Sequence, residues 1–132
     1  MRDIDVDRHY IFSDSGLKTA ATIWKQSSAL GIDTEFIRVD TFHPRPALIQ
    51  VSNGQHCWLI DILEINDFSP LHEIITAPHI IKIVHAAGED MEVCDRLRGA
   101  LPEPLFDTHI GAAFCVHGAS NGYSKLVQAI LE

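Results

Sequence analysis

The sequence has little cysteine and no long hydrophobic run. Its three cysteines, Cys57, Cys94 and Cys115, form no Cys-x-x-Cys pair, and no window approaches about 18 consecutive apolar residues. An odd number of widely spaced cysteines is typical of reduced thiols and predicts a cytoplasmic location. The missing run argues against a membrane-spanning helix, and the acidic start at residues 1–7 argues against a signal peptide.

Positively charged residues are also scarce. The chain has 10 Lys and Arg against 18 Asp and Glu, which gives a formal net charge of −8 and a pI near 5.3. A protein that binds nucleic acid only by neutralising phosphates needs an excess of Lys and Arg. The charge therefore argues against such a passive binder. An enzyme that meets phosphate groups through metal ions remains possible, because its ligand carboxylates add to the negative count.

Several common catalytic and binding motifs are missing as well. The sequence contains no Gly-x-Gly-x-x-Gly or Walker-type loop, and its eight histidines are scattered without the paired spacing of zinc ligands. The three cysteines fall in apolar periodic stretches, where a thiol is expected to be buried and unreactive. The sequence therefore argues against a nucleotide-binding loop, a zinc centre and a Cys-His hydrolase.

What is present is a regular alternation of strand and helix patterns in 132 residues, enough for one globular domain with its own core. The hydrophobic pattern predicts strands near 9–12, 28–37, 47–51, 56–60 and 79–84, and helices near 16–26, 69–77, 88–98, 108–116 and 123–132. A hairpin followed by strand-helix units predicts an α/β fold, with a mixed β-sheet flanked by helices.

Local signals mark several boundaries. Residues 13–15 offer N-caps for the first helix, and Asn53-Gly54 between two apolar runs predicts a hairpin. Residues 39–46 are expected to form a loop, because their two prolines can neither extend a strand ladder nor start a helix comfortably. Asp107, directly before Thr108, is interpreted as the N-cap of the helix that follows.

Two acids interrupt the apolar run between residues 29 and 37. Asp33 and Glu35 occupy alternate positions of the expected strand, so they share one face with Cβ atoms about 6.5–7 Å apart. Two partly buried anions at this spacing repel each other unless they are protonated or bound to a cation. A hard divalent cation such as Mg²⁺ or Mn²⁺ suits two carboxylates. The alternative is a strand face whose acids are solvated.

A third acid lies near the start of the helix expected at 88–98. Asp90 shares a helix face with Val93 and Cys94, so its carboxylate is expected to point toward the sheet. An acid in the first turn can simply complement the helix dipole, and this explains Glu89 well. It explains Asp90 less well, because a charge on an apolar face has a desolvation cost that calls for a partner.

These acids lie in motifs that resemble those of the DEDD 3′–5′ exonucleases, and of the ribonuclease D family in particular. The resemblance is carried by Ala47-Leu48-Ile49-Gln50, Leu59-Ile60-Asp61 and Ala112-Ala113-Phe114, and by three longer stretches: Asp33-Thr34-Glu35-Phe36, His85-Ala86-Ala87-Gly88-Glu89-Asp90-Met91-Glu92-Val93 and Leu105-Phe106-Asp107-Thr108. It covers nearly the whole chain from about residue 10. It implies a ribonuclease H-like exonuclease fold, with Asp33, Glu35 and Asp90 as the catalytic, metal-binding carboxylates.

The same resemblance implies an activity. It is phosphodiester hydrolysis with two Mg²⁺ or Mn²⁺ ions, at the 3′ ends of single-stranded RNA, in the processing of tRNA and other stable RNAs. His85, at the end of a strand, is expected to support the substrate-binding site. Phe36 could wedge against the terminal base, although a place in the core explains this residue at least as well.

One family motif is missing from the sequence. The third motif, Tyr-x3-Asp, is not found where the family has it, because Tyr123 is followed four residues later by Val127. Tyr10 is followed at that offset by Asp14, but this pair lies at the wrong end of the chain, on an expected strand-to-helix turn. We therefore expect residues 1–132 to be a C-terminally truncated exonuclease domain without helical nucleic-acid-binding domains, and to be weakly active or inactive. The alternative is a non-catalytic exonuclease-fold module that binds nucleic acid or a protein partner.

The last predicted helix is amphipathic, and the sequence stops within it without a Gly or Pro stop signal. Its apolar residues are Leu126, Val127, Ile130 and Leu131. If this face is uncovered, it favours self-association of the chain.

Overall fold

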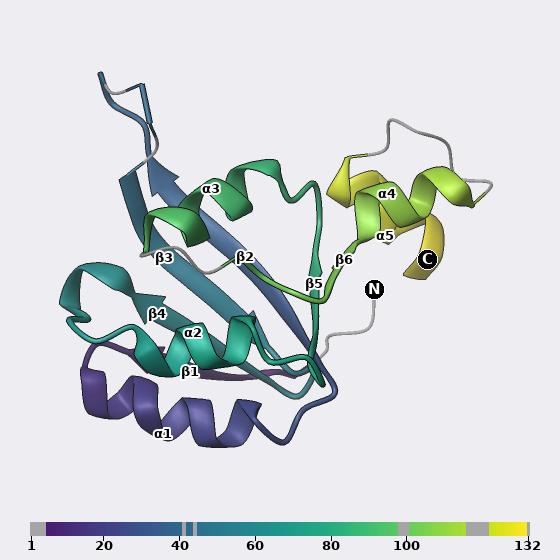
Figure 1. Cartoon of the computed structure of the whole chain (residues 1–132). Coiled ribbons are helices and arrows are strands. Elements are labelled where there is room, and N and C mark those ends of the chain that lie inside the picture. The colour runs from purple at the N-terminus through teal and green to yellow at the C-terminus, as the bar shows by residue number, and fades with distance from the viewer. Residues whose placement is uncertain (1–4, 41, 44, 98–100, 116–121, 132) are drawn as a thin grey trace.

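The computed structural model describes residues 5–40, 42–43, 45–97, 101–115 and 122–131. Within these residues, six strands form one mixed sheet in the order β1-β4-β3-β2-β5-β6 (Figure 1). β3 pairs antiparallel with both β2 and β4, whereas the β1–β4, β2–β5 and β5–β6 pairs are parallel. Strand β2 therefore joins the antiparallel part of the sheet to the parallel part.

The elements follow the order expected from the sequence. The strands are β1 (Asp7–Ile11), β2 (Ala29–Ile37), β3 (Arg45–Ser52), β4 (His56–Asp61), β5 (Ile81–Val84) and β6 (Leu105–Asp107). The helices are α1 (Asp14–Trp24), α2 (Ser69–Ile75), α3 (Gly88–Arg96), α4 (Thr108–Phe114) and α5 (Tyr123–Leu131). The predicted α/β class and mixed sheet are confirmed. Residues 1–4 of the acidic start and the predicted helix ends at 98, 116 and 132 fall outside the described residues.

Helices α1, α2 and α3 cover one face of the sheet, and α4 lies beside the edge strand β6 (Figure 1). Helix α1 buries Leu17 and Trp24, which are seven residues apart and so lie on one side of the helix. The Trp24 ring meets the Trp58 ring of β4 edge-on, with centroids 5.6 Å apart. The predicted N-cap is confirmed, since the Ser13 hydroxyl accepts a hydrogen bond from the Gly16 N–H at 3.1 Å.

Two predictions about strands were wrong. The loop expected over 39–46 is shorter, because β3 already begins at Arg45 and Pro46 pairs with Phe36. Pro46 is tolerated there because the register shifts between Glu35 and Phe36, and such a bulge interrupts the ladder that a proline cannot complete. Strand β6 was not predicted as a strand, since three residues are too few to display a period.

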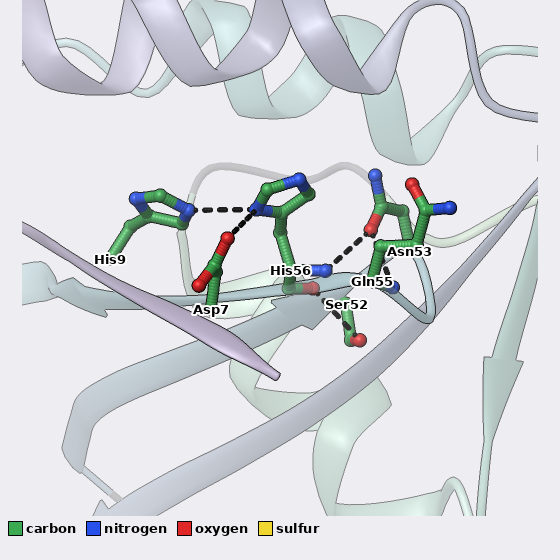
Figure 2. Close-up of polar contacts among 6 residues, drawn as sticks. All are labelled: Asp7, His9, Ser52, Asn53, Gln55 and His56. Carbon is green, nitrogen blue, oxygen red and sulfur yellow. Dashed lines mark hydrogen bonds and ion pairs between the residues drawn. The ribbon is translucent and has the colours of Figure 1, made fainter. Parts of the chain in front are cut away.

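The predicted hairpin between β3 and β4 is confirmed, and Figure 2 shows how its turn is held. The Asn53 side-chain oxygen accepts hydrogen bonds from the backbone N–H groups of Gln55 and His56, at 3.0 and 2.9 Å. The Ser52 hydroxyl donates to the His56 carbonyl at 3.0 Å. Gly54 has φ of +90°, a conformation that strains any other residue.

Next to this turn, two histidines that are 47 residues apart in the sequence come into contact. His9 Nε2 lies 3.0 Å from His56 Nδ1, and an Asp7 carboxylate oxygen lies 3.7 Å from the same His56 nitrogen (Figure 2). The His9 ring also stacks on Trp58. The parallel register of β1 and β4 produces this contact, which no spacing within the sequence indicates.

The burial of some predicted apolar residues differs from expectation. Cys94 is buried, but Cys57 is only partly buried and Cys115 is exposed, so the prediction of three buried thiols was wrong for Cys115. On α5, Leu126 is already buried within this chain, whereas Ile130 and Leu131 are exposed. None of the helices in the described ranges is both long and apolar enough to cross a membrane.

Strand β5 contains a fully buried cation that the sequence pattern did not reveal. The Lys82 side chain has no exposed surface, and its Nζ donates to the carbonyl oxygens of Ala77 and Ile80, at 2.8 and 2.6 Å. These carbonyls follow α2, where a cation complements the helix dipole. Burial lowers the pKa of Lys82, and the negative charge of Glu103 opposes that shift.

We expect Lys82→Ala to lower the free energy of unfolding by about 2–4 kcal/mol at pH 7, because it leaves two carbonyls without their donor and a cavity in the core. Since the pKa is lowered in the folded state, the wild type should gain stability as the pH rises toward the ordinary lysine value. Urea denaturation between pH 7 and 10 should show the difference between the two proteins widening. A constant difference would mean that Lys82 titrates normally.

Candidate active site

The two acids of β2 lie where the strand period predicts. Asp33 and Glu35 are exposed. Thr34, which lies between them, and Ile32, which precedes Asp33, are buried on the opposite face, against the helices. On the neighbouring strand, Gln50 pairs with Asp33. The two carboxylates therefore share the face of β2 that is turned away from α1, α2 and α3.

The third acid reaches the same strand from α3. The Thr34 hydroxyl donates to an Asp90 carboxylate oxygen at 2.5 Å, so α3 is joined to β2 at the residue between the two acids. Burial raises the pKa of Asp90, the Thr34 hydrogen bond opposes this, and the negative charge of Asp33 adds to the rise. Asp33 and Asp90 are thus close enough to repel each other, and a cation between them would relieve that repulsion.

A cavity of about 680 Å³ opens beside Asp33. Its polar lining comes from five segments of the chain: Asp33, Gln50, Ser52, His85, Thr108 and Tyr123. The His85 ring is met edge-on by the rings of His109 and Tyr123, with centroids 5.3 and 5.4 Å away. The structure therefore brings two residues predicted for the site, Asp33 and His85, to one concave surface.

The hydrogen bonds of His85 determine which ring nitrogen is available. The Thr108 hydroxyl donates to the Val84 carbonyl at 3.0 Å and lies 2.9 Å from His85 Nδ1. Because a hydroxyl has one proton, it must accept from His85 Nδ1–H. In the neutral ring Nε2 is then left as a hydrogen-bond acceptor.

Asp107 is confirmed as the N-cap of α4, and it also holds the turn that precedes α3. One carboxylate oxygen accepts from the N–H groups of His109 and Ala86, at 2.8 and 3.0 Å, and the other accepts from Ala87 at 2.9 Å. Ala86 has φ of +57°, which is unusual for a residue with a Cβ. Burial raises the pKa of Asp107, but hydrogen bonds from four backbone N–H groups outweigh it, so the pKa is lowered.

Phe36 follows the acids on β2 and is half-buried. The Arg38 guanidinium lies over its ring, 5.8 Å from the centroid, and also approaches Glu89 of α3 at 3.7 Å. The ring of Phe36 is thus partly covered by the Arg38 side chain, two residues later in the chain. Its expected contact with a terminal base stays a prediction.

The carboxylates offer hard oxygen ligands, but only part of a metal site is assembled. In the described part of the chain, no three His, Cys, Asp or Glu side chains lie close enough together to hold a metal ion. Asp33 and Asp90 influence each other electrostatically, whereas Glu35 lies farther along β2. The donor chemistry fits Mg²⁺ or Mn²⁺, and the convergence of all three carboxylates stays a prediction.

Two residues of the site were missed by sequence reasoning. Thr34 and Thr108 were noted only as parts of motifs, yet one orients Asp90 and the other orients His85. For Thr34 a signal existed: a threonine on the buried face of a strand needs a hydrogen-bond partner. For Thr108 the sequence offers no signal, because its partners lie 23 and 24 residues away.

Comparison with known proteins shows the family of the chain. A family model described as 3′–5′ exonuclease matches residues 8–132. Ribonuclease D of Pseudomonas paraeruginosa is 45% identical over 123 residues, which are 93% of this chain and 33% of the relative. Ribonuclease D of Escherichia coli is 42% identical over 118 residues, which are 89% and 32% of the two chains.

The fold is similar as well. The crystal structure of E. coli RNase D, described as an exoribonuclease involved in structured RNA processing, superposes with a TM-score of 0.90 at 40% identity, and the match covers 94% of this chain and 33% of that one. The predicted ribonuclease H-like exonuclease fold is thereby confirmed. The chain spans about a third of the length of the curated relatives that it matches.

Asp107→Asn should lower the free energy of unfolding by about 2–3 kcal/mol at pH 7, because charge-assisted bonds to the turn before α3 are lost. Since the Asp107 pKa is lowered in the folded protein, this stabilisation exists above the ordinary Asp pKa and disappears as the pH falls through the folded-state value. Urea denaturation at pH 7 and pH 3 should therefore show the two proteins converging in acid.

The matched control is Asp67→Asn. Asp67 also accepts a backbone hydrogen bond, from Ser69 at 2.9 Å, but it is exposed and holds no second segment. Its replacement should have a smaller effect, and it should leave hydrogen exchange at Ala86 and Ala87 unchanged. Equal effects of the two substitutions would show that Asp107 acts only as a helix cap.

Proposed function

Because this chain belongs to the 3′–5′ exonuclease family, we propose that it takes part in metal-dependent hydrolysis of RNA from the 3′ end. The observation that carries the proposal is the approach of Asp90 to the Asp33-Thr34-Glu35 segment of β2. Three carboxylates from two elements supply the hard, anionic oxygens that Mg²⁺ or Mn²⁺ requires. The RNA substrate follows from the curated relatives, which are ribonucleases D.

The proposed roles divide among the residues of the site. Asp33, Glu35 and Asp90 would hold the divalent ions, and the Thr34 hydroxyl keeps the Asp90 carboxylate in place. Two bound ions would supply an activated water and stabilise the leaving 3′ oxygen. The half-buried position of Asp90 strengthens its attraction for a cation, because a desolvated carboxylate gains more from a neighbouring charge than a solvated one.

The cavity beside Asp33 would receive the terminal nucleotide. His85 Nε2 is left as a hydrogen-bond acceptor, so it suits a ribose hydroxyl as its donor. Phe36 could form the edge of the site on the other side of Asp33 and Glu35. Cytoplasmic location and self-association through α5 belong to the same set of predictions.

The alternative is a non-catalytic exonuclease-fold module. The observation in its favour is that Tyr123 is followed four residues later by Val127, so residues 1–132 do not supply the fourth carboxylate and the tyrosine of the complete family domain at that place. The family match over residues 8–132 and the retained carboxylates favour the exonuclease. The two readings differ in whether the chain uses its metal ligands, which binding and activity measurements can separate.

Mn²⁺ should raise the stability of the chain by preferential binding to the folded state. At a free concentration ten times the Kd the gain is about 1.4 kcal/mol, or a few degrees in Tm. Asp33→Asn and Asp90→Asn should abolish the shift, because each removes a ligand charge. The measurement is thermal unfolding with and without Mn²⁺.

The control for this experiment is Asp95→Asn, an exposed acid on α3 outside the site. It should leave the Mn²⁺ shift unchanged. A shift that persists in Asp33→Asn would place the metal elsewhere and contradict the assignment of the carboxylates.

With Mn²⁺ present, the chain should shorten a 5′-labelled single-stranded RNA stepwise from a free 3′-hydroxyl end and leave a 3′-phosphate-blocked RNA intact. For residues 1–132 we expect a rate orders of magnitude below that of full-length E. coli ribonuclease D, because these residues do not supply the third family motif. Gel analysis of the product ladder checks both points, with Asp33→Asn as the inactive control. Internal fragments from the blocked RNA would indicate an endonuclease and refute the proposal.

A further inference from the structure

A second hollow lies on the α3 side of the sheet and shares no residue with the cavity beside Asp33. It has a volume of about 660 Å³ and is lined by residues from the β2–β3 connection, the start of β3 and the end of α3, among them Phe42, His43, Arg45, Arg96 and Leu97. In Figure 1 the end of α3 lies next to the start of β3. We call this hollow the arginine groove.

The charge of the arginine groove differs from that of the chain as a whole. The chain has a net charge of −8, yet the residues lining the groove include Arg45, Arg96 and His43 and no carboxylate. Four arginines belong to the described residues: Arg45 and Arg96 line the groove, Arg38 lies after β2 near the start of α3, and Arg8 lies on β1. Such a local concentration of arginines suits an anionic ligand.

The guanidinium groups remain available to such a ligand. Arg45 makes no ion pair with any residue that the structure describes. Arg96 approaches Glu92 only through Nε, at 3.7 Å, which leaves its outer N–H donors unpaired by that contact. Glu92 also lies 3.0 Å from His43 Nδ1, so it joins the β2–β3 connection to α3 and holds the groove together.

An exposed aromatic ring stands beside these cations. The Phe42 side chain is 90% exposed, and its ring meets the His43 ring edge-on at 4.9 Å. A single exposed apolar side chain is common on protein surfaces. Phe42 differs in that it lines the same hollow as Arg45 and Arg96. Arginines together with a free aromatic ring are the combination by which proteins hold single-stranded nucleic acid, through phosphate contacts and base stacking.

The groove is also at a suitable distance from the candidate metal site. Asp90 and Arg96 lie on the same helix, six residues apart, which is about 9 Å along the helix axis. At a stacked spacing of roughly 3.4 Å per nucleotide, this distance corresponds to two or three nucleotides. Arg38 connects the two regions, because it packs on Phe36 of β2 and approaches Glu89 of α3.

We infer that the arginine groove binds single-stranded RNA two or three nucleotides upstream of the 3′ end, with phosphates on Arg45 and Arg96 and a base stacked on Phe42. This inference rests on the proposed function, which places the 3′ end at Asp33 and Asp90. It explains how an acidic chain binds a polyanion: Arg45 and Arg96 are gathered near the end of α3, apart from the carboxylates.

The test is fluorescence anisotropy with a 5′-labelled 12-nucleotide single-stranded RNA whose 3′ end carries a phosphate, in EDTA so that no hydrolysis occurs. Arg45→Gln and Arg96→Gln should each weaken binding roughly threefold to tenfold and reduce the slope of log K against log salt by about 0.7. Phe42→Ala should weaken binding at least about fivefold, and Phe42→Tyr should restore it, because tyrosine also stacks.

Two controls separate the groove from general charge effects. Arg8→Gln, which removes an exposed arginine from the edge strand β1, should leave binding nearly unchanged. Binding of a mononucleotide should not respond to any of the groove substitutions, because one nucleotide is too short to reach from Asp90 to Arg96. All of the substituted residues are exposed, so the variants should keep the parent Tm.

Three results would overturn the inference: no binding of the 12-nucleotide RNA by the parent chain, equal losses in Arg8→Gln and Arg45→Gln, or no loss in the groove variants. If RNA binding is unchanged while Phe42→Ala abolishes self-association in light scattering, the groove is a protein interface. A failure of the proposed function can be told apart from a failure of this inference. The Mn²⁺-dependent rise in Tm tests the proposed function, whereas RNA binding in EDTA tests the groove without metal.

Discussion

The site depends on how the turn between β5 and α3 is held. Ala86 in that turn has a left-handed backbone conformation, and α3 has no capping side chain of its own, so the exposed N–H groups need an acceptor from elsewhere. Asp107 supplies it, and Thr108 beside it binds the two residues before the turn. One dipeptide at the start of α4 thus determines where α3 begins, and with it the position of Asp90.

The candidate metal site carries negative charge at Asp33 and Asp90, whereas the arginine groove carries positive charge. The half-buried Asp90 carboxylate faces the negative charge of Asp33, an arrangement that costs stability until a cation is bound. The arginines at the end of α3 and the start of β3 cannot relieve this repulsion, because they lie about two turns farther along the helix. Metal binding and RNA binding would therefore use separate charged surfaces that meet along α3.

Much of the fold was predictable because its signals are local. Alternation in β2 assigned Asp33 and Glu35 to one face and Thr34 to the other, and the Asn-Gly turn, the Ser13 cap and the Asp107 cap follow from neighbouring residues. The wrong predictions concern features without a local signal. Strand β6 is formed by its pairing with β5, and the exposure of Cys115 depends on packing at the end of α4, so neither can be read from nearby residues.

By itself the sequence determined the class of fold and the family, and it predicted the three carboxylates that we propose as metal ligands, because strand period, helix caps and short motifs depend on residues close together in the chain. Only the tertiary structure decided which atoms meet. The Thr34–Asp90 hydrogen bond joins residues 56 apart, and the groove combines the β2–β3 connection with the end of α3. Contacts of this kind follow from sheet register and helix packing, which bring together residues that no spacing in the sequence relates.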